Sequence, residues 1–130
     1  MKAKTLVLLH ILTAVTAAGV MLLALRAHAG SDDFARAERN YDTYCVQCHG
    51  VTRNGKGLNS PYMSVQPRDH SDAKGMEDIP DKEMRLAIQD GGLAVNKSVL
   101  MPAWGHVLSE REVDEMVAYL RHVCQCGVSQ

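Results

Sequence analysis

Apolar residues recur along this chain in four stretches, and the spacing within each stretch indicates what it forms. The first, Leu6 to Leu25, is mostly apolar and follows two lysines. The other three repeat apolar residues at three- and four-residue steps, the spacing of one face of an α-helix. They predict helices over about residues 33–45, 82–90 and 110–124. We find no convincing alternation of apolar and polar residues of the kind that predicts a strand.

Start and stop signals support the three helices. Asp32 and Asp81 stand where side-chain caps are expected for the first two helices, and Gly91–Gly92 permits a left-handed stop after the second. Ser109 and Glu112 have the spacing of a capping box for the third. The expected inward faces are Phe34, Ala37, Tyr41, Tyr44 and Cys45; Met84, Ala87 and Ile88; and Val113, Met116, Val117, Leu120, Val123 and Cys124.

Between the first two helices, Gly50 to Pro80 is rich in glycine and proline, which predicts long loops with room for one short helix. The chain therefore predicts an all-α fold of three to four helices joined by long ordered loops. A domain of about 100 residues has a thin core, and this one has a single Phe and a single Trp. Such a domain needs apolar bulk from another source.

The apolar start of the chain is predicted to be a signal peptide over residues 1–29. Ala27-His28-Ala29 has the small-x-small pattern of a cleavage site, so cleavage after Ala29 would leave residues 30–130 as one domain. An uncleaved membrane anchor is the alternative, because the run approaches the roughly 20 residues of a spanning helix. Loss of the leader removes three basic and no acidic residues, which changes the formal net charge from −1 to −4. That charge argues against a nucleic-acid partner.

The strongest chemical signal is Cys45-Val46-Gln47-Cys48-His49. Cys-x-x-Cys-His is the attachment pattern for c-type haem: two thioether bonds reach the porphyrin edge, and the histidine turns under the ring to bind the iron. Two disulfides, a four-cysteine zinc site with Cys124 and Cys126, and a redox Cys-x-x-Cys pair are the alternatives. None of them explains why His49 follows at once, or how an aromatic-poor domain fills its core.

These features together resemble a class I c-type cytochrome of the monohaem cytochrome c family. Met101-Pro102 follows the haem motif by about fifty residues and precedes the last helix, which carries the family-like run Val117 to Leu120. The resemblance covers Gly30 to Cys124. It implies a cytochrome c fold in which the first and last helices cross and long loops surround one haem.

The resemblance also implies a set of site residues. Cys45 and Cys48 would hold one covalent haem c, and His49 and Met101 would be the axial ligands of its iron. Met101 lies in the loop Leu100-Met101-Pro102-Ala103-Trp104-Gly105, which resembles the distal-ligand loop of the family. Met63 and Met76 remain conceivable distal ligands, and the further competitors are His70, His106, His122, Cys124 and Cys126.

Residues around the ligands follow from the same resemblance. A proline carbonyl is expected to accept the free imidazole N–H of His49, with Pro61 as the first candidate and Pro67 as the second. Trp104 is expected near the haem edge or, alternatively, as an ordinary core residue. Cys124 and Cys126 depart from the minimal family pattern. They are free to bridge to a partner, bind a metal, form a local disulfide or have no function.

We expect a periplasmic electron-transfer protein rather than an enzyme. Redox proteins would dock at the exposed haem edge, no small molecule would react at the iron, and the membrane would be involved only if the leader is retained. The alternatives are a haem c subunit of a periplasmic oxidoreductase complex, a small peroxidase and a gas sensor. The last two need an open position on the iron, which a bound Met101 would fill.

Overall fold

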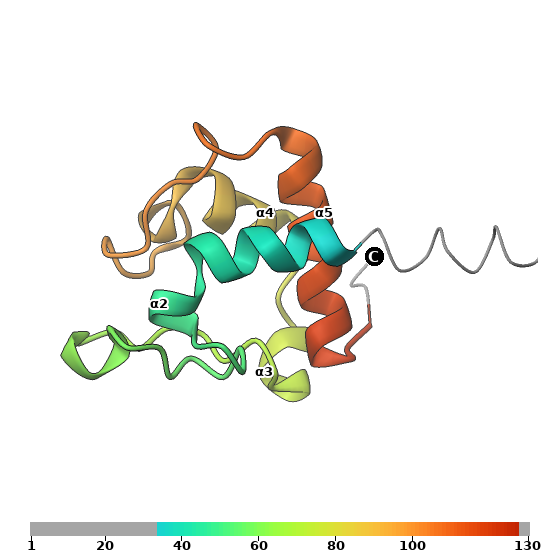
Figure 1. Ribbon diagram of the computed structural model, residues 1–130. Coiled ribbons are helices and arrows are strands. Elements are labelled where there is room, and N and C mark those ends of the chain that lie inside the picture. Colours follow the sequence, from blue (N-terminus) through green and yellow to red (C-terminus); the bar gives the residue numbers. More distant parts are fainter. Residues whose placement is uncertain (1–33, 128–130) are drawn as a thin grey trace, which may run out of the picture. The chain divides into compact units, whose positions relative to one another are not determined.

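A computed structural model describes residues 34–127. The predicted leader, its cleavage site and the expected cap Asp32 lie outside these residues. The described part is all-helical and contains no strand, as the sequence predicts (Figure 1). A helix over residues 34–44 is followed by α2 (Val46–His49), η1 (Ser60–Tyr62), α3 (Ala73–Glu77), α4 (Asp81–Asp90), η2 (Gly92–Val95) and α5 (Glu110–Cys124). Within residues 34–127, no helix has the length and apolar character needed to cross a bilayer.

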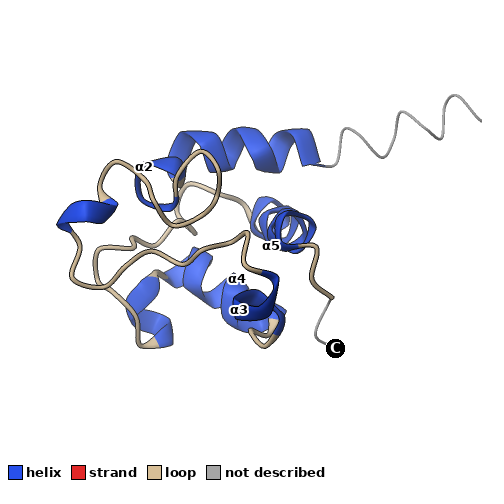
Figure 2. Ribbon diagram, turned by 90° about the horizontal axis from the view of Figure 1, so that it is seen from below, coloured by secondary structure: helices blue, strands red, loops and turns tan. Residues whose placement is uncertain are grey.

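The 34–44 helix and α5 cross, and their contact forms the centre of the fold (Figures 1 and 2). Ala37 and Tyr41, both at positions predicted to face inward, are fully buried. The ring of Tyr41 meets the ring of Tyr119 edge to face at a centroid distance of 5.8 Å. Phe34 stacks on His122 at 4.6 Å. These aromatic pairs fix where the two helices cross.

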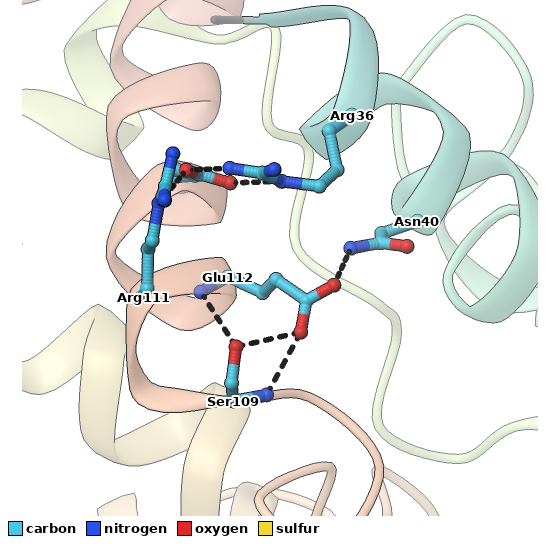
Figure 3. Close-up of polar contacts among 6 residues, drawn as sticks. Arg36, Asn40, Ser109, Arg111 and Glu112 are labelled. Atoms are coloured by element: carbon cyan, nitrogen blue, oxygen red, sulfur yellow. Dashed lines mark hydrogen bonds and ion pairs between the residues drawn. The ribbon is translucent and has the colours of Figure 1, made fainter.

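A polar seam runs beside this apolar contact (Figure 3). Arg36 donates a hydrogen bond from Nε to Glu115 on α5, and the Asn40 amide reaches the Glu112 carboxylate at 3.4 Å. Glu112 also accepts from the backbone N–H of Ser109, while the Ser109 hydroxyl accepts from the Glu112 N–H. The capping box predicted for the third helix is therefore confirmed, and it also contacts the first helix.

The predicted cap of α4 is wrong by one residue. Pro80 is the N-cap, no side chain caps the helix, and Asp81 is its first residue. The carboxylate of Asp81 instead accepts a hydrogen bond from Arg121 at 2.8 Å. A buried guanidinium is a stronger partner for a carboxylate than a free backbone amide, so the tertiary contact takes this side chain.

The buried face of α5 is broader than its apolar stripe predicts. Val113, Met116, Val117, Leu120 and Cys124 are buried as expected, while Val123 is only partly buried. Tyr119 and Arg121 are buried as well. Tyr119 faces the 34–44 helix, and Arg121 donates to the carbonyls of Met76 and Ile79. Because α5 is covered on more than one side, polar positions beside its stripe are also enclosed.

Candidate functional site

A cavity of about 470 Å³ lies among the described residues. This volume falls in the range of roughly 300–1,000 Å³ that is typical of ligand and cofactor sites. Its lining is predominantly apolar and comes from both ends of the domain, including residues of the 34–44 helix, α4 and α5. All five methionines of residues 34–127 contribute to the wall: Met63, Met76, Met84, Met101 and Met116.

The Cys-x-x-Cys-His motif lies at the wall of this cavity. The 34–44 helix ends directly before Cys45, which is the N-cap of the single turn α2. The backbone N–H of His49 donates to the carbonyl of Cys45 at 2.9 Å, so the motif closes into one turn. Cys45, Cys48 and His49 all line the cavity as a result. One turn of helix thus presents two sulfurs and an imidazole to the same space.

A glycine loop supports the motif from behind. The N–H groups of Gly55 and Gly57 donate to the carbonyls of His49 and Cys48 at 2.9 and 3.0 Å. A Cβ on Gly57 would lie 2.4 Å from the Gln47 carbonyl oxygen, which is closer than any ordinary contact. Glycine is therefore required here for the loop to satisfy the free carbonyls at the end of α2.

His49 is held by a backbone carbonyl. Its Nδ1 lies 3.0 Å from the carbonyl oxygen of Arg68, and since that oxygen only accepts, Nδ1 carries the proton. The lone pair is then on Nε2, as metal ligation through that nitrogen requires. Burial lowers the pKa of His49, which favours the neutral imidazole, although the Arg68 carbonyl acts in the opposite direction.

This acceptor corrects the expectation for the prolines. Pro61 lies in η1, is exposed and does not line the cavity. Pro67 does line the cavity, but the carbonyl that faces His49 belongs to the next residue, Arg68. Any residue offers a carbonyl, and the backbone path of the 63–70 loop decides which one faces the imidazole.

His70 lies beside His49. The two rings stack at a centroid distance of 4.3 Å and an angle of 17°, and His70 Nδ1 shares a hydrogen bond with the Tyr41 hydroxyl at 3.0 Å. Two axial histidines would sit on opposite sides of a metal and could not stack face to face. Burial, with the neighbouring His49 and Arg68, lowers the pKa of His70 well below its usual value. His70 is therefore placed to support His49 and not to oppose it.

Met101 reaches the cavity because two glycines let its loop approach α4. The Gly92 N–H donates to the Met101 carbonyl at 3.0 Å, and the Met101 N–H donates to the Ser98 carbonyl at 3.2 Å. A Cβ on Gly92 would lie 2.3 Å from the Ser98 oxygen and 3.1 Å from Met101 Cβ. The Gly91–Gly92 pair thus ends α4 and also positions the loop that carries Met101.

The other expected residues divide between the cavity and the surface. Trp104 lines the cavity and packs on Tyr44 at a centroid distance of 5.1 Å. His106 is exposed, and His122, also exposed, stacks on Phe34; neither lines the cavity. Met63 and Met76 also line the cavity, so their position does not exclude them as alternatives to Met101 for the thioether ligand.

The four cysteines form two separate pairs. Cys124 and Cys126 are joined in a disulfide, while neither Cys45 nor Cys48 is bonded to another cysteine. This pairing argues against a four-cysteine zinc site and against a second disulfide. Within residues 34–127, no cluster of three or more His, Cys, Asp or Glu side chains could hold a metal ion. Two thiols and one buried imidazole at an apolar cavity fit a covalently bound haem, whose ring would supply the missing apolar bulk.

Comparison with protein families gives the same assignment. The family model described as cytochrome c oxidase, cbb3-type, subunit III, matches residues 32–120. The chain belongs to this family. The family is one of class I monohaem c-type cytochromes, so the resemblance noted in the sequence is confirmed and the activity is haem-based electron transfer. No curated protein matches the chain. The segment shared with the cbb3-type subunit III family includes both motif cysteines, His49 and Met101, and it ends before Cys124.

Several features of the site are missed by sequence reasoning. The Arg68 carbonyl has no sequence signal, because it depends on how the 50–80 loop folds. His70 is a candidate ligand from the sequence, but its stacking on His49 depends on the same loop and has no sequence signal. The methionine wall has a weak signal: a chain with few aromatic residues and seven methionines has few other side chains to fill its core. Met84 and Met116 are predicted as core residues, and they are both buried and part of the cavity wall.

Proposed function

We propose that the chain is a periplasmic one-electron carrier that binds a single haem c covalently through Cys45 and Cys48, with His49 and Met101 as axial ligands. The observation that carries the proposal is that these four side chains, from segments far apart in the sequence, line one apolar cavity. When bound, a haem supplies an iron that alternates between the ferrous and ferric states. The remaining steps depend on what the chain's own residues do.

His49 and Met101 determine how readily an electron is held. The hydrogen bond from Nδ1 to the Arg68 carbonyl orients the imidazole and increases its basicity. A soft thioether from Met101 favours ferrous iron and raises the reduction potential relative to a second nitrogen ligand. If His49 and Met101 both bind the iron, no substrate needs to reach the metal.

The mouth of the cavity indicates where electrons would enter and leave. Val65 and Leu100 line the cavity and are also 49% and 55% exposed. An apolar rim of this kind suits brief docking of a redox protein, because contact there excludes water without needing a large interface. The formal charge of −4 expected after leader removal would attract a basic partner at low salt.

A haem c subunit of an oxidoreductase complex is the second candidate, and the description of the matching family favours it. The two candidates differ in what accompanies the protein in its native source. A carrier is recovered alone in the soluble fraction, and its electron-transfer rate falls as salt rises. A subunit is extracted from membranes together with larger chains and separates from them only under dissociating conditions.

Covalent attachment is the decisive test. The purified mature protein should start at Gly30 and carry the mass of one haem that survives denaturation. Alkylation of cysteines must be done in denaturant, because burial and the adjacent Cys48 raise the pKa of the Cys45 thiol to about 12 and would slow its reaction in the folded chain. Cys124→Ser, which leaves the motif intact, is the control for Cys48→Ser. Colourless protein whose Cys45 and Cys48 both alkylate would refute the proposal.

A further inference from the structure

We propose that the Cys124–Cys126 disulfide is a reversible thiol–disulfide exchange site, and that Arg121 stabilises its reduced form. The bridge lies at the carboxyl end of α5, and Gln125 alone separates the two cysteines. It lies beyond residues 32–120, the segment shared with the family, and outside the set of residues lining the cavity. The electron-carrier function therefore leaves it unexplained.

The bridge has little value as a structural staple. A disulfide stabilises a fold mainly by restricting the unfolded chain, and this effect grows with the length of the loop that the bridge closes. Here the two sulfurs belong to residues two positions apart in one segment. The bridge joins no distant parts of the fold. Gln125, enclosed by it, has a φ of 51°, a left-handed conformation uncommon for a residue other than glycine.

Each sulfur has a partner suited to its reduced form. Cys124 is buried, and its sulfur lies 3.3 Å from the carbonyl oxygen of Arg121, which can accept from a thiol. Cys126 is partly exposed, and its sulfur lies 3.4 Å from a guanidinium nitrogen of Arg121. A guanidinium beside a sulfur favours the thiolate. Reduction would thus give a buried thiol with an acceptor and an accessible thiolate with a cation.

The cation is fixed in place before any thiolate forms. Arg121 is buried, and it donates to the Asp81 carboxylate at 2.8 Å and to the carbonyls of Met76 and Ile79 at 2.9 and 2.5 Å. A side chain held by three acceptors needs little further ordering to stabilise a new negative charge. Stabilising the reduced form makes a disulfide easier to reduce.

The exchange has a defined order of bonds. In the reduced site, the Cys126 thiolate attacks one sulfur of a partner disulfide, forms a mixed disulfide and releases the partner's other sulfur as a thiolate. Cys124 then loses its proton and attacks the Cys126 sulfur, which closes the bridge and releases the second partner thiolate. Two electrons pass from the cysteine pair to the partner disulfide. The reverse sequence oxidises a partner dithiol, and a dithiol protein or a glutathione-class thiol is the reactant.

The first test measures how easily the bridge opens in the complete haem-loaded protein. The protein is equilibrated with mixtures of reduced and oxidised glutathione, and its free thiols are labelled with a maleimide and counted by mass. We expect two labels per chain to appear together in native conditions. Arg121→Gln should need a glutathione mixture at least about tenfold more reducing, the effect of losing one charge-assisted contact. Arg111→Gln, which removes an exposed cation from the same helix, should match the wild type.

A second test leaves Arg121 unchanged, because Arg121 also holds the 76–81 segment and its loss could disturb the fold. Cys124→Ser retains only the accessible sulfur at this site, and Cys126→Ser retains only the buried one. Each variant is mixed with oxidised glutathione, and mixed-disulfide formation is timed. Cys126 should react at least about tenfold faster than Cys124. Equal rates, or a wild-type bridge that opens only in denaturant, would overturn the proposal.

Discussion

Gly92 allows the link between α4 and the Met101 loop to be tested by adding one methyl group. In Gly92→Ala, the new Cβ would lie 2.3 Å from the Ser98 carbonyl oxygen, whereas ordinary contacts fall at 3.4–4 Å. The segment from Ser98 to Met101 must therefore withdraw from Gly92 by roughly 1 Å, and overpacking of this kind costs about 1–3 kcal/mol of stability. The same Cβ would lie 3.1 Å from Met101 Cβ, so the displaced segment includes the expected ligand.

The displacement should be visible at the iron. The Gly92 N–H donates a hydrogen bond to the Met101 carbonyl at 3.0 Å, and withdrawal of the loop would break this hydrogen bond. We expect the Met101 sulfur to leave the iron in a large fraction of molecules. The optical spectrum should show high-spin iron, CO should bind the ferrous form, and the reduction potential should fall by on the order of 100 mV, within the about 0.8 V range over which axial ligands tune haem potentials.

The matched control is Gly75→Ala in α3. A Cβ there would meet the Asp72 carboxylate oxygen at 2.5 Å, but this atom is at the end of a side chain that can turn away. Its spectrum, CO binding and potential should equal those of the wild type. A Gly92→Ala protein that stays low-spin, excludes CO and keeps its potential would refute the reasoning that Gly92 positions the distal ligand.

Three further outcomes are expected. Met101→Ala should lower the reduction potential at least as much as Gly92→Ala and open the iron to cyanide and CO. Redox titration and ligand binding measure both effects, and unchanged values would mean that another thioether is the distal ligand. Ser109→Ala should cost about 1 kcal/mol in denaturant unfolding with no change in the haem spectrum, since it removes only a helix cap; a spectral change would contradict this. Hydrogen bonding from Arg36 lowers the pKa of Glu115, so its contribution is present above the ordinary carboxyl pKa and is lost as pH falls through the lowered value. Glu115→Gln should therefore lower the free energy of unfolding by less than about 1 kcal/mol at pH 7 and leave it equal to the wild-type value in acid. A difference between the two proteins that grows as the pH falls would contradict this prediction.

The parts of the fold that could be predicted are those whose signals are local. The third helix has the predicted bounds because its capping box and apolar stripe lie within its own sequence. The predicted cap of α4 is wrong because the Asp81 side chain bonds Arg121, forty residues later in the chain. A helix cap can be predicted from residues adjacent in the sequence, but a distant side chain that binds the capping residue cannot.

The candidate site also contains some residues that the sequence indicates and others that only the fold brings together. Cys45, Cys48 and His49 are adjacent in the sequence, so their spacing alone indicates their chemistry. The Arg68 carbonyl that holds His49 has no such signal, because every residue has a carbonyl and the fold decides which one is near. The two glycines after α4 are visible as a helix stop, yet their close approach to the Met101 loop appears only once the chain is folded.

The five methionines around the cavity have a consequence for the rate at which an electron can move. When the charge at the centre of the site changes by one, water or flexible polar side chains would have to reorient, and that nuclear movement slows transfer. Thioethers are polarisable, so much of the response of this wall is a shift of electrons that needs no atom to move. Where its wall is made of methionine, the cavity would therefore respond to a change of charge with little movement of atoms, which lowers the reorganisation energy of electron transfer.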